Sequence, residues 1–126
     1  MKQLTILGAT GSIGASTLEV VSLHPERFKV FALTAWRDVA AMQRLCLQYQ
    51  PRYAVMRDAA AALLLKTHLA DSRTEVLSGE ESLSQVARDS EVDIVVAAIV
   101  GASGLRPTIA AATAGKHILL ANKEVL

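Results

Sequence analysis

Three glycines in the spacing Gly8-x-x-Gly11-x-x-Gly14 are the feature that most constrains the fold of this chain. They follow an apolar run at residues 4–7, which predicts a buried strand, and open residues 12–22, whose apolar spacing predicts a helix. Gly8 would permit a tight turn, and Gly14 would let the helix pack closely on the strand. Gly11 would let a pyrophosphate approach the backbone at the positive end of the helix. A strand, a glycine turn and a helix in this order predict a nucleotide-binding α/β unit.

Strand-like and helix-like segments alternate along the chain. The expected strands span residues 4–7, 28–33, 53–56, 74–77, 93–98 and 117–121, and the expected helices span 12–22, 39–49, 59–69, 80–88 and 107–114. The strand at 93–98 is apolar after its first residue, as expected at the centre of a parallel sheet. The alternation predicts an α/β fold, a doubly wound, mainly parallel sheet of the Rossmann type with helices on both faces. We expect one domain over residues 1–126.

Local signals predict several helix ends. Asp38, Asp58 and Ser78 are interpreted as N-caps of the helices that follow them. Pro25 ends the first helix, because a proline disfavours helix at the residue before it. Gly115 is a typical C-terminal stop for the last helix.

Composition excludes several classes of function. A content of 52% hydrophobic and 20% charged residues indicates a globular domain with an aliphatic core. The net charge of +1 argues against a nucleic-acid partner, and no apolar run reaches the roughly 20 residues of a membrane span. The single cysteine, Cys46, excludes an internal disulfide and is expected to be buried on a helix, so the expected location is cytoplasmic. His24, His68 and His117 lack metal-ligand spacing, so we expect no metal site in this chain.

The residues after the second expected strand bear on the choice of cofactor. That strand leads into Trp36, Arg37 and Asp38 with no acid at its tip to grip a ribose 2′-hydroxyl. Arg37 is well placed for a 2′-phosphate and could stack on adenine. The pattern favours NADP over NAD, with Asp38 interpreted as a helix cap rather than as a ribose ligand.

Polar residues also follow the last expected strand. Asn122, Lys123 and Glu124 come directly after it, and Gly101 follows the strand at 93–98. In this fold ligands lie beyond the carboxyl ends of the strands. Three adjacent polar residues there favour a ligand site over a solvated turn.

Taken together, these segments resemble the N-terminal domain of the 1-deoxy-D-xylulose 5-phosphate reductoisomerase family. The resemblance covers essentially the whole chain, and it rests on residues 7–14, 24–28, 98–101, 104–108 and 121–124. The glycine loop alone would not be specific, since aspartate-semialdehyde dehydrogenases look similar there. The set of motifs is specific.

The resemblance implies an activity and its cofactors. The family converts 1-deoxy-D-xylulose 5-phosphate to 2-C-methyl-D-erythritol 4-phosphate, a step of non-mevalonate isoprenoid biosynthesis, using NADPH and a divalent metal, Mg²⁺ or Mn²⁺. The full-length enzyme is expected to be a homodimer acting on a phosphorylated deoxy sugar. By matched position, the residues implied to bind NADPH are Thr10, Gly11, Ser12 and Ile13 at the pyrophosphate, Arg37 near the 2′-phosphate, and Asn122 and Glu124, with Lys123 at the substrate.

The family's metal-binding acids, substrate-phosphate residues and mobile lid belong to a catalytic domain that the resemblance puts beyond residue 126. We therefore expect the chain to be a fragment that binds no metal, holds no complete catalytic site and is inactive alone. Three positions depart from the family pattern: Trp36 stands where the family usually has Gly, Asp38 where it often has Asn, and Val125 where it usually has Ser. The alternatives are a non-catalytic nucleotide-binding module with altered cofactor preference, and another oxidoreductase with the same glycine loop. The motif Asn122-Lys123-Glu124 argues against another oxidoreductase.

Overall fold

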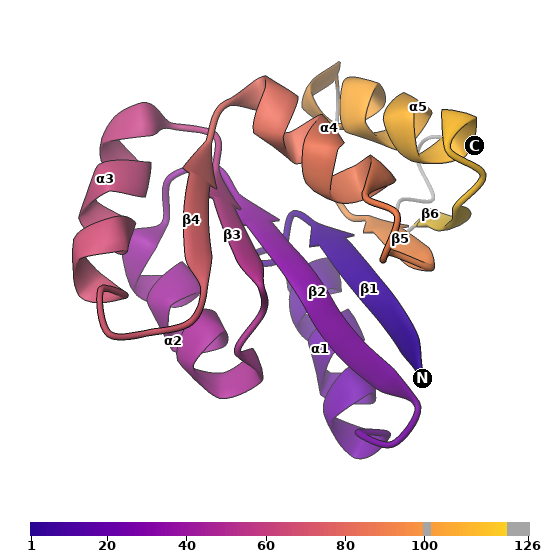
Figure 1. Cartoon of the computed structure of the whole chain (residues 1–126), viewed down its shortest axis with the longest axis horizontal. Helices are drawn as coiled ribbons and strands as arrows, with labels where there is room; N and C mark the ends of the chain where they lie inside the picture. The colour runs from indigo at the N-terminus through magenta and orange to yellow at the C-terminus, as the bar shows by residue number, and fades with distance from the viewer. Residues whose placement is uncertain (100–101, 121–126) are drawn as a thin grey trace.

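The computed structural model describes residues 1–99 and 102–120. Within these residues six parallel strands form one sheet in the order β4-β3-β2-β1-β5-β6 (Figure 1). The strands are β1 (Lys2–Leu7), β2 (Phe28–Ala35), β3 (Tyr53–Met56), β4 (Glu75–Ser78), β5 (Ile94–Ala97) and β6 (His117–Leu120). The helices are α1 (Ser12–Leu23), α2 (Val39–Tyr49), α3 (Ala59–His68), α4 (Glu80–Arg88) and α5 (Leu105–Thr113), and a short 3₁₀ turn, η1 (Ala102–Gly104), precedes α5. The fold is the α/β, Rossmann-type arrangement expected from the sequence.

Helices cover both faces of the sheet. One core cluster joins α1, α2 and α3 to one face, through side chains such as Leu18, Met42 and Leu65. A second cluster joins α4 and α5 to the opposite face, through side chains such as Leu83 and Ala111. Figure 1 shows the two groups of helices on opposite sides of the strands. Both clusters are mainly aliphatic, as the low aromatic content requires.

Cys46 lies in the first of these clusters. It projects from α2 and is fully buried, as expected from the sequence. Burial raises the pKa of its thiol from the ordinary value of 9.0 to about 12, because a thiolate would lose its hydration there.

One predicted helix cap and one predicted helix start are wrong, although α4 spans residues 80–88 as expected. Ser78 does not cap α4; it is the last residue of β4, and Gly79 at a φ of 92° takes the N-cap position. The last helix begins at Leu105 rather than at Pro107, because a proline is tolerated within the first turn of a helix and need not open it. The caps at Asp38 and Asp58 are confirmed, since their carboxylates accept from the N–H groups of Ala41 and Ala61.

The predicted helix stops are both confirmed. His24, just before Pro25, is the C-cap of α1, and Gly115 follows α5 at a φ of 77°. Among the described residues no helix is both long and apolar enough to cross a membrane.

Candidate functional site

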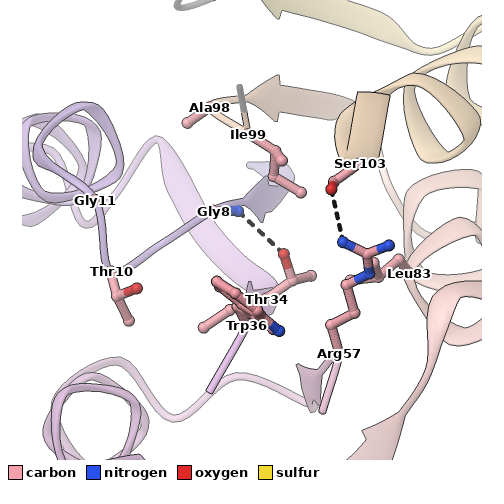
Figure 2. Close-up of a pocket in the computed structure, with 11 residues that line it drawn as sticks. Gly8, Thr10, Gly11, Thr34, Trp36, Arg57, Leu83, Ala98, Ile99 and Ser103 are labelled. Carbon is pink, nitrogen blue, oxygen red and sulfur yellow. Dashed lines mark hydrogen bonds between the residues drawn. The ribbon is translucent and has the colours of Figure 1, made fainter. Parts of the chain in front are cut away.

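The sheet changes its winding direction between β1 and β5. The strands β2, β3 and β4 extend from one side of β1, and β5 and β6 from the other. In such sheets the crevice beyond the carboxyl ends of the two diverging strands is the usual ligand site. A pocket of about 410 Å³ lies there (Figure 2), lined by Gly8, Thr10, Gly11, Thr34, Ala35, Trp36, Arg57, Leu83, Ala98, Ile99 and Ser103.

Two glycines at the junction of β1 and α1, Gly8 in the loop and Gly14 in the helix, are required by the backbone. Gly8 has a φ of 85°, and a Cβ there would lie 2.9 Å from the carbonyl oxygen of Ala98 at the end of β5. A Cβ at Gly14 would collide with the carbonyl oxygen of Gly8 and the backbone of Ala9, so α1 reaches the loop only without a side chain. The roles expected for both residues, a tight turn and close packing, are confirmed.

Gly11 differs from these two glycines. The nearest heavy atom to a Cβ built at Gly11, chain neighbours aside, is the carbonyl oxygen of Gly8 at 3.8 Å. Packing within the described residues therefore does not require a glycine here. A missing side chain that leaves open space beside a pocket is what close approach of a ligand to the backbone requires.

The N-terminus of α1 is built differently from those of α2 and α3. Its N-cap is Gly11, which has no side chain to accept from the N–H groups of the first turn. The other two helices are capped by the carboxylates of Asp38 and Asp58. First-turn N–H groups without a side-chain cap, at the positive end of a helix dipole, are suited to an anion.

Thr34 fixes the loop to β2 and was missed in the sequence. Its hydroxyl accepts from the N–H of Gly8 at 3.0 Å, and its carbonyl accepts from the N–H of Ala9 at 2.8 Å. The residue is fully buried, so these bonds are shielded from water. A polar residue near the end of an otherwise apolar run, residues 30–35, is the signal that could have identified it.

The segment after β2 carries an aromatic–cation pair. Trp36 lines the pocket and is 61% exposed, and the guanidinium carbon of Arg37 lies 4.5 Å from the centroid of its ring. Arg37 is not among the lining residues, so its guanidinium stacks on Trp36 outside the lined volume. The Asp38 carboxylate accepts from the Ala41 N–H at 3.1 Å, as expected for a helix cap.

The side of the pocket opposite Thr10 and Gly11 is formed by Arg57, Leu83, Ser103 and Ile99, here called the far wall. Ile99 is its edge nearest the loop, because its Cγ1 would lie 3.2 Å from a Cβ built at Gly8. Figure 2 shows the Arg57 side chain rising from the end of β3 toward Ser103, with the loop residues Thr10 and Gly11 on the opposite side. Arg57 Nη1 donates to Ser103 Oγ at 2.6 Å. None of these four residues was predicted, although Arg57 directly follows an expected strand, where ligand-binding residues are expected.

The structure brings only some of the predicted site residues together. Thr10 and Gly11 line the pocket, whereas Ser12 and Ile13 form the first turn of α1 beside it. Gly101 and the three polar residues Asn122, Lys123 and Glu124 lie outside the described residues. Over residues 1–99 and 102–120, no group of three or more His, Cys, Asp or Glu side chains could hold a metal ion.

A family model and the curated relatives that match this chain all name the same enzyme. The family model of 1-deoxy-D-xylulose 5-phosphate reductoisomerase matches residues 4–126. The chain is 59% identical over 128 residues to the reductoisomerase of Ectopseudomonas mendocina, covering 100% of this chain and 32% of the relative. It is 60% identical over 127 residues to that of Nitrosomonas europaea, covering 99% of this chain and 31% of the relative. The chain thus spans about a third of the length of these curated relatives.

Solved structures agree with the sequence matches. A crystal structure of DOX-P reductoisomerase in complex with NADPH, fosmidomycin and magnesium is 46% identical with a TM-score of 0.93, over 98% of this chain and 31% of that one. The enzyme from Zymomonas mobilis in complex with NADPH is 40% identical with a TM-score of 0.92, over 99% of this chain and 33% of that one. The match of the family model over nearly all residues, together with this shared fold, shows that the chain belongs to the 1-deoxy-D-xylulose 5-phosphate reductoisomerase family.

Proposed function

We propose that this chain is the NADPH-binding domain of a 1-deoxy-D-xylulose 5-phosphate reductoisomerase. The observation that carries the proposal is the pocket between the glycine loop and the end of β5, at the point where the sheet changes its winding direction. Membership of the family and the NADPH in two of the related structures support it. The complete enzyme would isomerise and reduce 1-deoxy-D-xylulose 5-phosphate to 2-C-methyl-D-erythritol 4-phosphate.

In this proposal the loop binds the pyrophosphate. Thr10 and Gly11 line the pocket, and the first-turn N–H groups at Ser12 and Ile13 have no side-chain cap that competes for them. The open space beside Gly11 fits a phosphate resting on the backbone. The residues present thus fit the diphosphate part of a dinucleotide.

Arg37 would meet the 2′-phosphate of NADPH, because it lies one residue past Trp36 at the end of β2, where the adenosine ribose lies in this fold. Stacking on the Trp36 ring holds the guanidinium at that edge. Because Asp38 is engaged in capping α2, its carboxylate is held by the helix rather than free to turn toward the phosphate. The stacking of Arg37 on Trp36 and the capping bond of Asp38 to the Ala41 N–H both support a preference for NADPH over NADH.

The remaining residues of the proposal rest on their positions in the family's motif. Asn122 and Glu124 would contact NADPH, and Lys123 would contact the substrate, where a cation can polarise a hydroxyl or carbonyl of an anionic sugar. NADPH would supply the hydride. A divalent metal, Mg²⁺ or Mn²⁺, would be held by parts of the enzyme beyond this chain; one related structure contains magnesium and fosmidomycin.

We further propose that the other domains of the enzyme are needed for turnover. The chain spans about a third of its relatives, so we expect residues 1–126 alone to be inactive with NADPH, the deoxy sugar phosphate and Mg²⁺. An assay of NADPH oxidation tests this, and turnover by the purified chain would contradict it. The complete protein is expected to be a cytoplasmic homodimer without nucleic-acid or membrane partners.

The direct test of the proposed function is a calorimetric titration of the chain with NADPH and with NADH. NADPH should bind at least tenfold more tightly, since its 2′-phosphate adds a charge-assisted contact worth about 1.5–3 kcal/mol. Trp36 is the single tryptophan, so quenching of its fluorescence should follow the same binding curve. In Trp36→Phe the optical signal should disappear while the calorimetric signal stays.

A second function is favoured by one observation, the exposed Trp36 ring stacked with Arg37 at the pocket edge. If this pair excludes the adenosine, the chain would be a non-catalytic nucleotide-binding module with altered cofactor preference. Failure to bind either cofactor, or tighter binding of NADH, would favour this alternative.

A further inference from the structure

The far wall contains a cation that the proposed function does not use. Arg57 follows the last residue of β3, and its N–H donates to the carbonyl of Ala35 at 2.9 Å. The next residue, Asp58, caps α3 by accepting from the N–H of Ala61 at 2.9 Å. Arg57 therefore sits between a paired strand and a capped helix, and its backbone is fixed at the edge of the pocket.

Ser103 holds the other end of this side chain. The serine lies in η1, which packs closely on the end of β5: a Cβ at Gly104 would be only 2.9 Å from the carbonyl oxygen of Ile99. The bond from Arg57 Nη1 to Ser103 Oγ, at 2.6 Å, thus connects the end of β3 to the turn after β5. Arg57 is exposed to solvent, and this bond directs its guanidinium along the wall of the pocket that it lines.

The guanidinium of Arg57 is also free of acidic partners in the part of the chain that the structure describes. The ion pairs among those residues are His24–Glu26, Arg52–Glu91 and Arg88–Glu81. A guanidinium offers five donors and two flat faces, and Ser103 is its single side-chain partner among the described residues. Beside it the far wall is apolar, with buried Leu83 and half-buried Ile99.

A dinucleotide whose pyrophosphate lies on the glycine loop runs along the end of β2 with its adenosine half. The ribose would then lie near Thr34 and Trp36, and the base would reach the far wall, between two aliphatic side chains and the guanidinium. A flat aromatic base stacks favourably on a guanidinium plane. Arg37, in contrast, stacks on the Trp36 ring and is not among the residues that line the pocket.

We propose that Arg57 recognises the adenine base of the bound dinucleotide by stacking, that Ser103 positions it, and that the 2′-phosphate is left to Arg37. This rests on the proposed function. The two arginines then separate two properties: Arg57 sets the affinity for any adenine dinucleotide, and Arg37 sets the discrimination between NADPH and NADH.

The test is calorimetric titration of the wild-type chain and of Arg57→Met and Arg37→Met with NADPH and NADH. Arg57→Met should weaken both cofactors by the same factor, about five- to tenfold, because stacking on a guanidinium contributes about 1 kcal/mol. Arg37→Met should weaken NADPH alone. Arg57→Lys should resemble Arg57→Met, since an ammonium keeps the charge and loses the plane. Thermal unfolding checks that each variant is folded.

Three results would overturn the inference while leaving the proposed function in place: wild-type affinity in Arg57→Met, a selective loss of NADPH binding in that variant, or full rescue by Arg57→Lys. Absence of binding by the wild-type chain would instead overturn the proposed function, and the inference with it. For Ser103, a double-mutant cycle is decisive. Ser103→Ala should weaken both cofactors about twofold in the wild-type background and have no effect in Arg57→Met, whereas an equal loss in both backgrounds would contradict its positioning role.

Discussion

At the glycine-loop end of the pocket the surface is made by the backbone, whereas at the far wall it is made by side chains. Gly8 and Gly14 leave no room for a Cβ, and Thr34 holds the loop by two hydrogen bonds. The far wall depends instead on one bond between Arg57 and Ser103. The first end is therefore rigid and tolerates few substitutions. At the far wall, Arg57 is exposed and Ser103 half-buried, so these two side chains can be replaced without disturbing the core, whereas Leu83 belongs to it.

The largest effect is expected for Gly14→Ala. The added methyl would overlap the Gly8 carbonyl and Ala9, so α1 would have to move away from the loop. We expect the free energy of unfolding to fall by about 3 kcal/mol, as for overpacked cores, and NADPH binding to be lost. Urea denaturation and calorimetry measure the two quantities. If Gly14→Ala were as stable as the wild type, the conclusion that the glycine-loop end tolerates few substitutions would be wrong.

Gly11→Ala is the matched control within the same loop. A Cβ there would come no closer than 3.8 Å to its nearest neighbour and the φ is −80°, so we expect a stability change within about 1 kcal/mol. NADPH affinity should nevertheless fall at least tenfold, because the methyl would occupy the approach of the pyrophosphate. Unchanged affinity would show that the ligand does not rest on this residue.

Thr34→Val tests the connection between the loop and β2. The substitution keeps the shape and removes the hydroxyl that accepts from the Gly8 N–H, so the unfolding free energy should fall by about 1–2 kcal/mol. NADPH affinity should fall severalfold as the loop loosens. Thr74→Val is the control: it removes a buried hydroxyl bonded to Pro51 at 2.6 Å, away from the pocket lining, and should cost similar stability with no change in affinity. Equal losses of affinity in the two variants would argue against a specific role for Thr34.

The smallest effect concerns Cys46, which belongs to neither end. The pKa of the Cys46 thiol is about 12 in the folded chain and ordinarily 9.0. The contribution of the buried, protonated thiol to the unfolding free energy is therefore complete below pH 9 and is lost as the pH rises toward 12. Between these values the unfolded thiol ionises and the folded one does not. By pH 9.5 the unfolding free energy should have fallen by about 1 kcal/mol from this group. In Cys46→Ala this part of the alkaline loss should vanish, as urea denaturation at a series of pH values would show; an identical pH profile in both proteins would exclude the thiol as its source.

The sequence predicts the glycine-loop end of the pocket well and the far wall poorly. The alternation of strands and helices, the turn at Gly8 and the caps at Asp38 and Asp58 follow from local rules that act over a few residues. Arg57 and Ser103 are 46 residues apart, and only the strand order brings them together. Ser78 shows the opposite error, in which a correct local preference for capping is overridden because the residue is needed as the end of β4.

The strand order also determines when the pocket can form during folding. β1 pairs with β2, its neighbour in sequence, but also with β5; the Gln3 N–H donates to the Asp93 carboxylate 90 residues away, and the Ala98 N–H donates to Leu7. Contacts between distant segments close large loops and form slowly. We expect the amides of β2 and β3 to gain protection from hydrogen exchange before those of β5. In that order of events the crevice is one of the last parts of the molecule to assemble, and a nascent chain that has folded only as far as β4 would have a glycine loop but no site.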